Sequence, residues 1–312
     1  LDKTKTAMGA RNLRKYIEQP LVQKYDIEKR LDALNELLDN AISREEIREY
    51  LSPIYDLERL ITRVTYMSAN PRDLIAFKNS IGMLPPIKTL LEDFDTELLK
   101  ELQTDMDPLE ELYQLIDASI MEEPPISVRE GGLIKDGYNE NVDKYRHAKT
   151  EGKTWLAELE AKEREKTGIK NLKIKFNKVF GYYLEVTNSY RDLVPDYFTR
   201  KQTLANAERY ITPELKELED MILGAEDKLI NLEYDLFCEV RNRIAAEVVR
   251  IQKTAKAVAK LDTFVSLAVV ADQNNYCRPK INENGVIDIK DGRHPVVEKM
   301  MNNDMFIAND TY

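Results

Sequence analysis

The chain has 312 residues, with 46 Lys plus Arg against 56 Asp plus Glu and a formal net charge of −10. Charged residues make up 33% of it, and no stretch approaches the roughly twenty apolar residues of a membrane span, which excludes such a span. Two cysteines and two histidines are too few for a disulfide framework or a thiolate zinc cage, and they disfavour histidine-based catalysis. The first ten residues show no secretory signal, so we expect a cytoplasmic protein.

The first 125 residues have the pattern of short amphipathic helices. Apolar residues at three- and four-residue spacings predict two helices within residues 4–38, separated by Pro20. Ser43 with Glu46 matches a capping box, and Asn70-Pro71 predicts a helix start. Proline steps interrupt the rest of this region, which predicts a helical bundle that supplies the hydrophobic core.

Two longer helices are predicted further along the chain. No proline occurs from Asn139 to Lys166, and only Gly152 interrupts the helical pattern there. Thr212-Pro213-Glu214 is a strong helix start, followed by an apolar seam like that of a coiled coil. If this second helix continued unbroken to Gln273, it would be roughly 90 Å long and would have to project from a compact body.

The segment between these helices is expected to form a small sheet. Apolar and polar residues alternate from Leu172 to Asn177 and again from Tyr182 to Thr187, around a turn ending at Gly181. This pattern predicts a β-hairpin between an outgoing and a returning helix, at the tip of a stalk. Short strands around Ile281 and at 286–289 predict the start of another domain. The fold class is therefore mainly α, with long antiparallel helices carrying a β-rich insertion, plus the start of a C-terminal α/β domain.

Basic residues concentrate on the predicted hairpin. Residues 162–201 carry ten basic and five acidic side chains, a local charge of +5, which leaves −15 for the rest. Lys166 through Tyr183 contain five lysines and no acid. These lysines could protect an edge strand from pairing with other chains. The hypothesis we favour is contact with a polyanion, because alternate residues of a strand are about 7 Å apart, close to the phosphate spacing along one strand of duplex DNA.

The candidate phosphate contacts fall in two groups on either side of the hairpin and its following loop. Cations and small polar donors suit phosphate oxygens, although the second group, taken without the neighbouring hairpin, would favour the ordinary polar cap of the returning helix. Nothing in the sequence indicates a catalytic acid and base pair, and Gly152-Lys153-Thr154 lacks the earlier glycine of a phosphate-binding loop. The first group is Lys173, Lys175, Asn177 and Lys178, and the second is Arg200, Lys201, Thr203, Asn206 and Arg209.

Several stretches resemble the bacterial DNA mismatch-repair family MutS, and the likeness covers all 312 residues. They include residues 8–11, 55–60, 129–140, 176–183, 202–216 and 292–296. The resemblance implies a helical core and outgoing lever (1–152), an inserted clamp (153–211), a returning lever helix (212–275) and the beginning of an ATPase domain (276–312). It also implies that the sequence is a fragment from the middle of a longer protein.

The resemblance further implies a homodimer whose clamps touch the backbone of double-stranded DNA, with downstream mismatch-repair proteins as partners. Clamp position would be coupled to an ATPase that uses ATP and Mg²⁺ and is absent from this chain. We therefore expect the chain alone to be no enzyme and to hold neither cofactor nor metal. The alternative is a protein-interaction scaffold, in which a coiled-coil-like arm carries a basic tip that binds an acidic partner.

Overall fold

The computed structural model describes residues 2–301 and 306–312, and the fold is mainly α, as predicted. The chain divides into two compact units. The helical unit contains the chain up to Ala69, Asp73–Asp117 and the chain from Arg241 onward. The sheet unit contains Asn70–Arg72 and Ala118–Val240.

The helical unit is a bundle of short helices around one long helix, α11 (Val248–Asn274). Apolar and small residues occupy every side of α11, and most of its length is buried, as expected of a helix at the centre of a bundle. It packs against α1, α2, α3, α4 and α7. The other elements of the unit are α1 (Ala7–Glu18), α2 (Lys24–Asp39), α3 (Ala41–Leu51), α4 (Leu57–Thr65), α5 (Pro71–Ile81), α6 (Leu84–Leu90), η1 (Leu91–Asp93), α7 (Glu97–Asp105), α8 (Glu110–Ser119), β5 (Ile289–Gly292), α12 (Pro295–Met300) and β6 (Asn309–Thr311).

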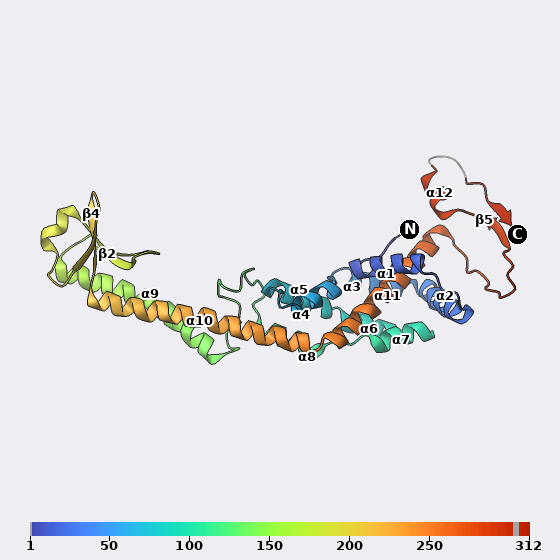
Figure 1. Ribbon diagram of the computed structural model, residues 1–312, viewed down its shortest axis with the longest axis horizontal. Coiled ribbons are helices and arrows are strands. Elements are labelled where there is room, and N and C mark those ends of the chain that lie inside the picture. The colour runs from blue at the N-terminus through green and yellow to red at the C-terminus, as the bar shows by residue number, and fades with distance from the viewer. Residues whose placement is uncertain (1, 302–305) are drawn as a thin grey trace. The chain divides into compact units, whose positions relative to one another are not determined.

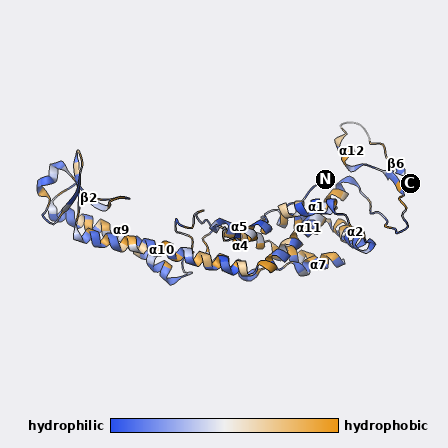
Figure 2. Ribbon diagram, viewed as in Figure 1, coloured by the Kyte–Doolittle hydropathy of each residue, from blue (hydrophilic) through white to orange (hydrophobic). Residues whose placement is uncertain are grey.

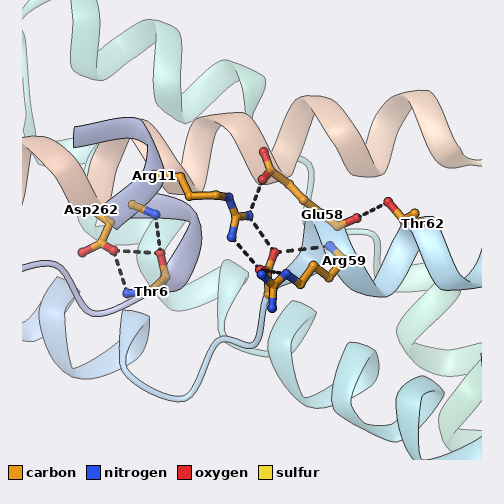
Figure 3. A network of polar contacts seen from close by, with 8 residues as sticks. Thr6, Arg11, Glu58, Arg59, Thr62 and Asp262 are labelled. Atoms are coloured by element: carbon orange, nitrogen blue, oxygen red, sulfur yellow. Dashed lines mark hydrogen bonds and ion pairs between the residues drawn. The ribbon is translucent and has the colours of Figure 1, made fainter. Parts of the chain in front are cut away.

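The start of α1 is fixed to α11 by a buried carboxylate. Asp262 accepts hydrogen bonds from the backbone N–H of Lys5 at 2.9 Å and of Thr6 at 2.8 Å, and from the Thr6 hydroxyl at 2.7 Å. Thr6 is also the N-cap of α1, because its hydroxyl oxygen accepts from the N–H of Gly9. Figure 3 shows this cluster beside Arg11, which donates to Glu58 in the first turn of α4 and to Asp56, the N-cap of that helix. Backbone donors that a helix start leaves unpaired are thus satisfied by side chains.

Several predictions about the helical bundle are confirmed and several are wrong. The two helices within residues 4–38 and the helix start at Pro71 are confirmed. The capping box at Ser43 is wrong, because α3 begins at Ala41 and Ser43 lies inside it. No strand forms around Ile281 in the described part of the chain, and the strand predicted at 286–289 runs instead from Ile289 to Gly292.

The returning helix is not continuous to Gln273, so the condition for a single helix of roughly 90 Å is not met. It is two helices, α10 (Pro213–Ala246) and α11, separated by Glu247 at φ −96° and ψ 17°. At this residue the N–H of Glu247 bonds the carbonyl of Ile244, a tighter turn than the α-helical one. The helix α10 alone is about 50 Å long at 1.5 Å per residue.

The sheet unit consists of two long antiparallel helices and a four-stranded antiparallel sheet at their end (Figure 1). The predicted hairpin is confirmed as β1 and β2, with the register Lys173 opposite Glu185. The sheet order is β1-β2-β4-β3, so β1 and β3 are the edges. The elements are α9 (Glu140–Thr167), β1 (Lys173–Asn177), β2 (Gly181–Thr187), η2 (Asn188–Leu193), β3 (Thr199–Thr203), β4 (Ala207–Ile211) and α10.

The predicted seam of α10 packs against α9. Leu215, Ile222, Ala225, Leu229 and Leu236 are buried, and Figure 2 shows polar residues interspersed with apolar ones along both helices. Gly152 of α9 lies directly over the seam, since a Cβ there would be 2.5 Å from Cγ1 of Ile222. Glycine at position 152 therefore allows the two helices to approach closely, which gives it a structural role rather than one in a phosphate-binding loop.

A buried ion pair ties the irregular segment before α9 to the helix pair. Glu233 of α10, fully buried, accepts from Arg146 of α9 at 2.6 Å and from the N–H of Gly132 at 2.6 Å. The same Arg146 also donates to the carbonyl of Ile134 at 3.0 Å. Gly131 and Gly132 adopt φ of 73° and 74°, which L side chains rarely do. The segment therefore takes its shape from this carboxylate and from its glycines.

Candidate nucleic-acid interface

The sheet has an inner face against the helices and an outer face on the opposite side. Residues paired across antiparallel strands point to the same face. Leu184, Val186 and Tyr210 form one core cluster with Leu156 of α9 and Leu215 of α10, which defines the inner face. The register then assigns to the outer face Lys173, Lys175, Asn177, Tyr183, Glu185, Gln202 and Arg209. Four of the nine candidate residues thus share the outer face.

Two cations of the outer face are engaged by one carboxylate. Lys175 Nζ donates to Glu185 Oε1 at 2.7 Å, and this bond raises the pKa of Lys175. Arg209 Nε lies 3.9 Å from the other oxygen of Glu185, while its Nη1 donates to Gln202 at 2.8 Å. The Arg209 guanidinium stacks over the Tyr183 ring at 4.4 Å from the centroid. These contacts fix both cations and reduce their net positive charge.

Three of the candidate lysines are exposed and have no ion pair among the described residues. Lys173 lies on the outer face of edge strand β1, and Lys178 lies in the turn between β1 and β2. Lys201 occupies the bulge of the other edge strand, β3, where the register shifts between Arg200 and Gln202. An exposed lysine without a neighbouring carboxylate keeps its full charge available to an anion from solution.

Arg200 belongs to the inner face rather than the outer one, since it pairs with Tyr210 across the strands. Its Nη1 lies 3.4 Å from Oε1 of the buried Glu208, and Arg191 lies 3.7 Å from the same oxygen. The Tyr210 hydroxyl also donates to Glu208. Burial and this bond raise the pKa of Tyr210 to about 12. Arg200 therefore has a structural partner in this unit.

The three uncharged candidates occupy turns and an edge. Asn177 uses its side-chain oxygen to accept from the N–H groups of Val179 at 2.8 Å and Phe180 at 3.3 Å, which closes the hairpin turn. Asn206 is exposed in the turn between β3 and β4, and Thr203 is exposed on the edge strand β3. The side chain of Asn177 is already committed to the backbone, whereas those of Thr203 and Asn206 are exposed at the rim of the sheet.

Sequence reasoning missed β3 and β4. All five residues of 199–203 are polar, and 207–211 do not alternate, so neither segment has the period of two that revealed β1 and β2. It also missed Glu185 and Gln202 as neighbours of the cations. Their position follows from pairing β2 with β4 and β3 with β4, which no local pattern indicates.

The contacts of Glu208 predict how the stability of the folded chain depends on pH. The Tyr210 hydrogen bond, aided by the charges of Arg191 and Arg200 and opposed by burial, lowers the pKa of Glu208. A lowered pKa means that this carboxylate stabilises the folded state above its unfolded pKa of about 4.3, and that the stabilisation is lost as the pH falls through the folded value. The Glu208→Gln variant should therefore have a lower free energy of unfolding than the parent chain at pH 7. Below about pH 4.3, its free energy of unfolding should change less with pH than that of the parent chain. Urea unfolding across this range measures it, and parallel pH profiles would contradict it.

Neither a metal-binding cluster nor a membrane-spanning helix occurs among the described residues. Within 2–301 and 306–312, no three His, Cys, Asp or Glu side chains gather as a metal-binding set. No helix of the same residues combines the length and apolar character needed to cross a bilayer.

The comparisons with known proteins agree with the resemblance of the sequence. The family model described as MutS domain III matches residues 1–268. The chain belongs to this family. It is 66% identical over 312 residues to the DNA mismatch repair protein MutS of Lachnoclostridium phytofermentans. Proteins of the same name from Acetivibrio thermocellus and Ruminiclostridium cellulolyticum are 54% identical over 312 residues and 56% identical over 311.

The chain corresponds to only a part of these MutS relatives. All of the chain is covered in each of the three alignments, but only 34%, 36% and 36% of the relative. The chain thus spans about a third of their length, and the prediction of a fragment of a longer family member is confirmed.

Proposed function

We propose that this chain is the part of a DNA mismatch-repair protein that holds duplex DNA through its phosphate backbone. The observation that carries the proposal is a sheet, at the end of two long helices, whose exposed Lys173, Lys178 and Lys201 have no ion pair within the described residues. Contacts of this kind position a duplex without reading its sequence. The names of the relatives support mismatch repair as the process in which the grip is used.

The helices give the grip a mechanical role in this proposal. The α9–α10 pair is packed along its seam and joined by the ion pairs Lys149–Glu226 at 2.6 Å and Lys162–Glu214 at 2.8 Å. A stiff pair of helices suits the transmission of a displacement to the sheet. We propose that this displacement is driven by an ATPase outside the chain, where ATP and Mg²⁺ bind, and that two copies act together on the duplex.

The scaffold alternative is less well supported. A scaffold needs an apolar stripe left open for a partner helix. The seam residues of α10 in the sheet unit are instead buried by the chain itself, and the large exposed apolar side chains of this stretch, Met221 and Tyr234, are separated by thirteen positions. An acidic partner protein could still bind the lysines, and the test below separates it from DNA.

Charge reversal at Lys173 tests the grip. Lys173→Glu, made in the full-length protein, should weaken binding to matched and mismatched duplexes alike, because phosphates are common to both. The slope of log affinity against log salt should become shallower by about 0.9, because the variant neutralises one phosphate fewer. Fluorescence anisotropy with labelled duplexes across a salt series measures both quantities, with an acidic protein as competitor.

Lys153→Glu is the matched control. Lys153 is exposed in α9, about 20 Å along the helix from its sheet end, and makes no ion pair with a described residue. The change in net charge is the same, so the control should leave the salt slope near that of the parent protein. Equal effects of the two substitutions, or an unchanged slope in Lys173→Glu, would remove the support for a phosphate contact at this residue.

A further inference from the structure

The outer face of the sheet carries a single carboxylate among its cations. Following the register across β1, β2, β4 and β3, Glu185 is the one Asp or Glu of those strands on this face, and Lys173, Lys175 and Arg209 share the face with it. Glu185 holds Lys175 at 2.7 Å and lies 3.9 Å from Arg209. The face as a whole therefore retains a net positive charge, but two of its cations are screened by one acid.

Arg209 is held in place without being fully satisfied. The Tyr183 ring and the Gln202 side chain orient its guanidinium, as described above. Its Nε is buried and has no hydrogen-bond partner, because Glu185 at 3.9 Å is beyond hydrogen-bond distance. A donor without an acceptor costs free energy, but this atom is closed to solvent, so an anion recovers the cost only if Glu185 moves aside. The guanidinium is thus a preorganised ligand for an anion that approaches more closely than Glu185 does.

We propose that Glu185 is an internal substitute for a phosphate, which binds Lys175, lies beside Arg209 and is displaced when a phosphodiester backbone reaches the outer face. The inference rests on the proposed function. A carboxylate and a phosphodiester each carry one negative charge, so the exchange gives Lys175 a new partner in place of the old one. Fewer counterions are then released than an unpaired lysine would release. Glu185 consequently lowers the affinity for duplex DNA and makes that affinity less dependent on salt.

Glu185→Gln in the full-length protein tests this role. The substitution frees both cations, so duplex affinity near physiological salt should rise about two- to fivefold, the range for an exposed ion pair. The salt slope should steepen by about 0.9 for each cation that gains a phosphate. Glu158→Gln is the matched control, since Glu158 is exposed in α9 and forms no ion pair with any described residue. Its effect on affinity should be smaller and its salt slope unchanged.

Two further variants separate local from general effects and cover a failure of Glu185→Gln to fold. Since Glu185 already neutralises Lys175, Lys175→Gln should reduce the salt slope by less than Lys173→Gln does. Combining Lys175→Gln with Glu185→Gln should cancel most of the gain, which a double-mutant cycle quantifies.

The outcomes distinguish the two proposals. Equal effects of Glu185→Gln and Glu158→Gln, or equal reductions of the salt slope in Lys173→Gln and Lys175→Gln, would overturn the role of Glu185 while leaving the grip intact. If Lys173→Gln also leaves duplex binding unchanged, the proposed function itself fails.

Discussion

Replacing Glu233 with Ala should lower the free energy of unfolding of the sheet unit by about 2–4 kcal/mol, less than for a fully buried ion pair, because Arg146 is 29% exposed and keeps Asp136 as a partner. Glu233 is fully buried and accepts from Arg146 and from the N–H of Gly132, both at 2.6 Å. Its removal leaves Arg146 with only Asp136 and the carbonyl of Ile134 as partners, and it frees the segment that holds Gly132. Urea unfolding followed by far-UV circular dichroism measures the loss, and hydrogen exchange at Gly132 reports the freed segment.

Glu226→Ala provides a control on the same helix. Glu226 pairs with Lys149 at the same distance of 2.6 Å, but the two side chains are 36% and 42% exposed. Water screens such a pair, so its loss should cost no more than about 1 kcal/mol. The comparison removes the same side chain from an ion pair of the same length, while burial and the cation, Arg146 or Lys149, differ. Similar losses in the two variants would show that burial does not set the strength of the Arg146–Glu233 contact.

Replacing Asp262 with Ala should lower the free energy of unfolding of the helical unit by about 2–4 kcal/mol. The substitution leaves the buried N–H and hydroxyl of Thr6 and the N–H of Lys5 without their acceptor, and each unsatisfied buried donor costs about 1–3 kcal/mol before water or rearrangement compensates. The attachment of α1 to α11 shown in Figure 3 should loosen. Urea unfolding measures the loss, and faster hydrogen exchange in the first turn of α1 locates it.

The pH dependence gives this prediction a second readout. Burial, outweighing the hydrogen bonds from Lys5 and Thr6, raises the pKa of Asp262. The folded state therefore keeps this proton to a higher pH than the unfolded state, whose pKa is about 3.9. The stabilisation from this protonation is complete below that value and declines as the pH rises through the folded pKa. Asp262→Ala should lack this decline.

Asp105→Ala is the matched control for Asp262. Asp105 pairs with Lys253 of α11 at 2.9 Å, with side chains 38% and 60% exposed, so its loss should cost at most about 1 kcal/mol. A loss as small in Asp262→Ala would mean that solvent satisfies the start of α1 as well as the carboxylate does.

The sequence alone determined the elements whose signals are local. The spacing of apolar residues and the flanking residues placed the outgoing helix at Asn139–Lys166, within one residue of α9 at each end. Alternation and the turn ending at Gly181 placed the β1–β2 hairpin. The run of lysines without an acidic residue, from Lys166 to Tyr183, indicated a basic surface, and part of this run forms the β1–β2 hairpin. These features depend on residues a few positions apart, where period and capping act directly.

The tertiary structure decided which of the candidate residues lie together. Arg209 meets Glu185 only because β4 pairs with β2, and Arg200 reaches Glu208 because β3 pairs with β4 so that Arg200 lies opposite Tyr210. Likewise, Arg146 and Glu233 are 87 positions apart and meet through helix packing. The end of α10 at Glu247 has no proline or glycine to announce it.

The physical reason is the range of each interaction. Helix period, caps and tight turns are energetic preferences of adjacent residues, so the amino-acid order specifies them. Strand pairing, burial and the partner of a charge depend on segments that fold against one another, and a shift of one residue in register turns every side chain to the opposite face. The sequence could therefore show that this protein presents lysines on a small sheet, whereas only the folded chain shows which of its cations Glu185 and Glu208 already hold.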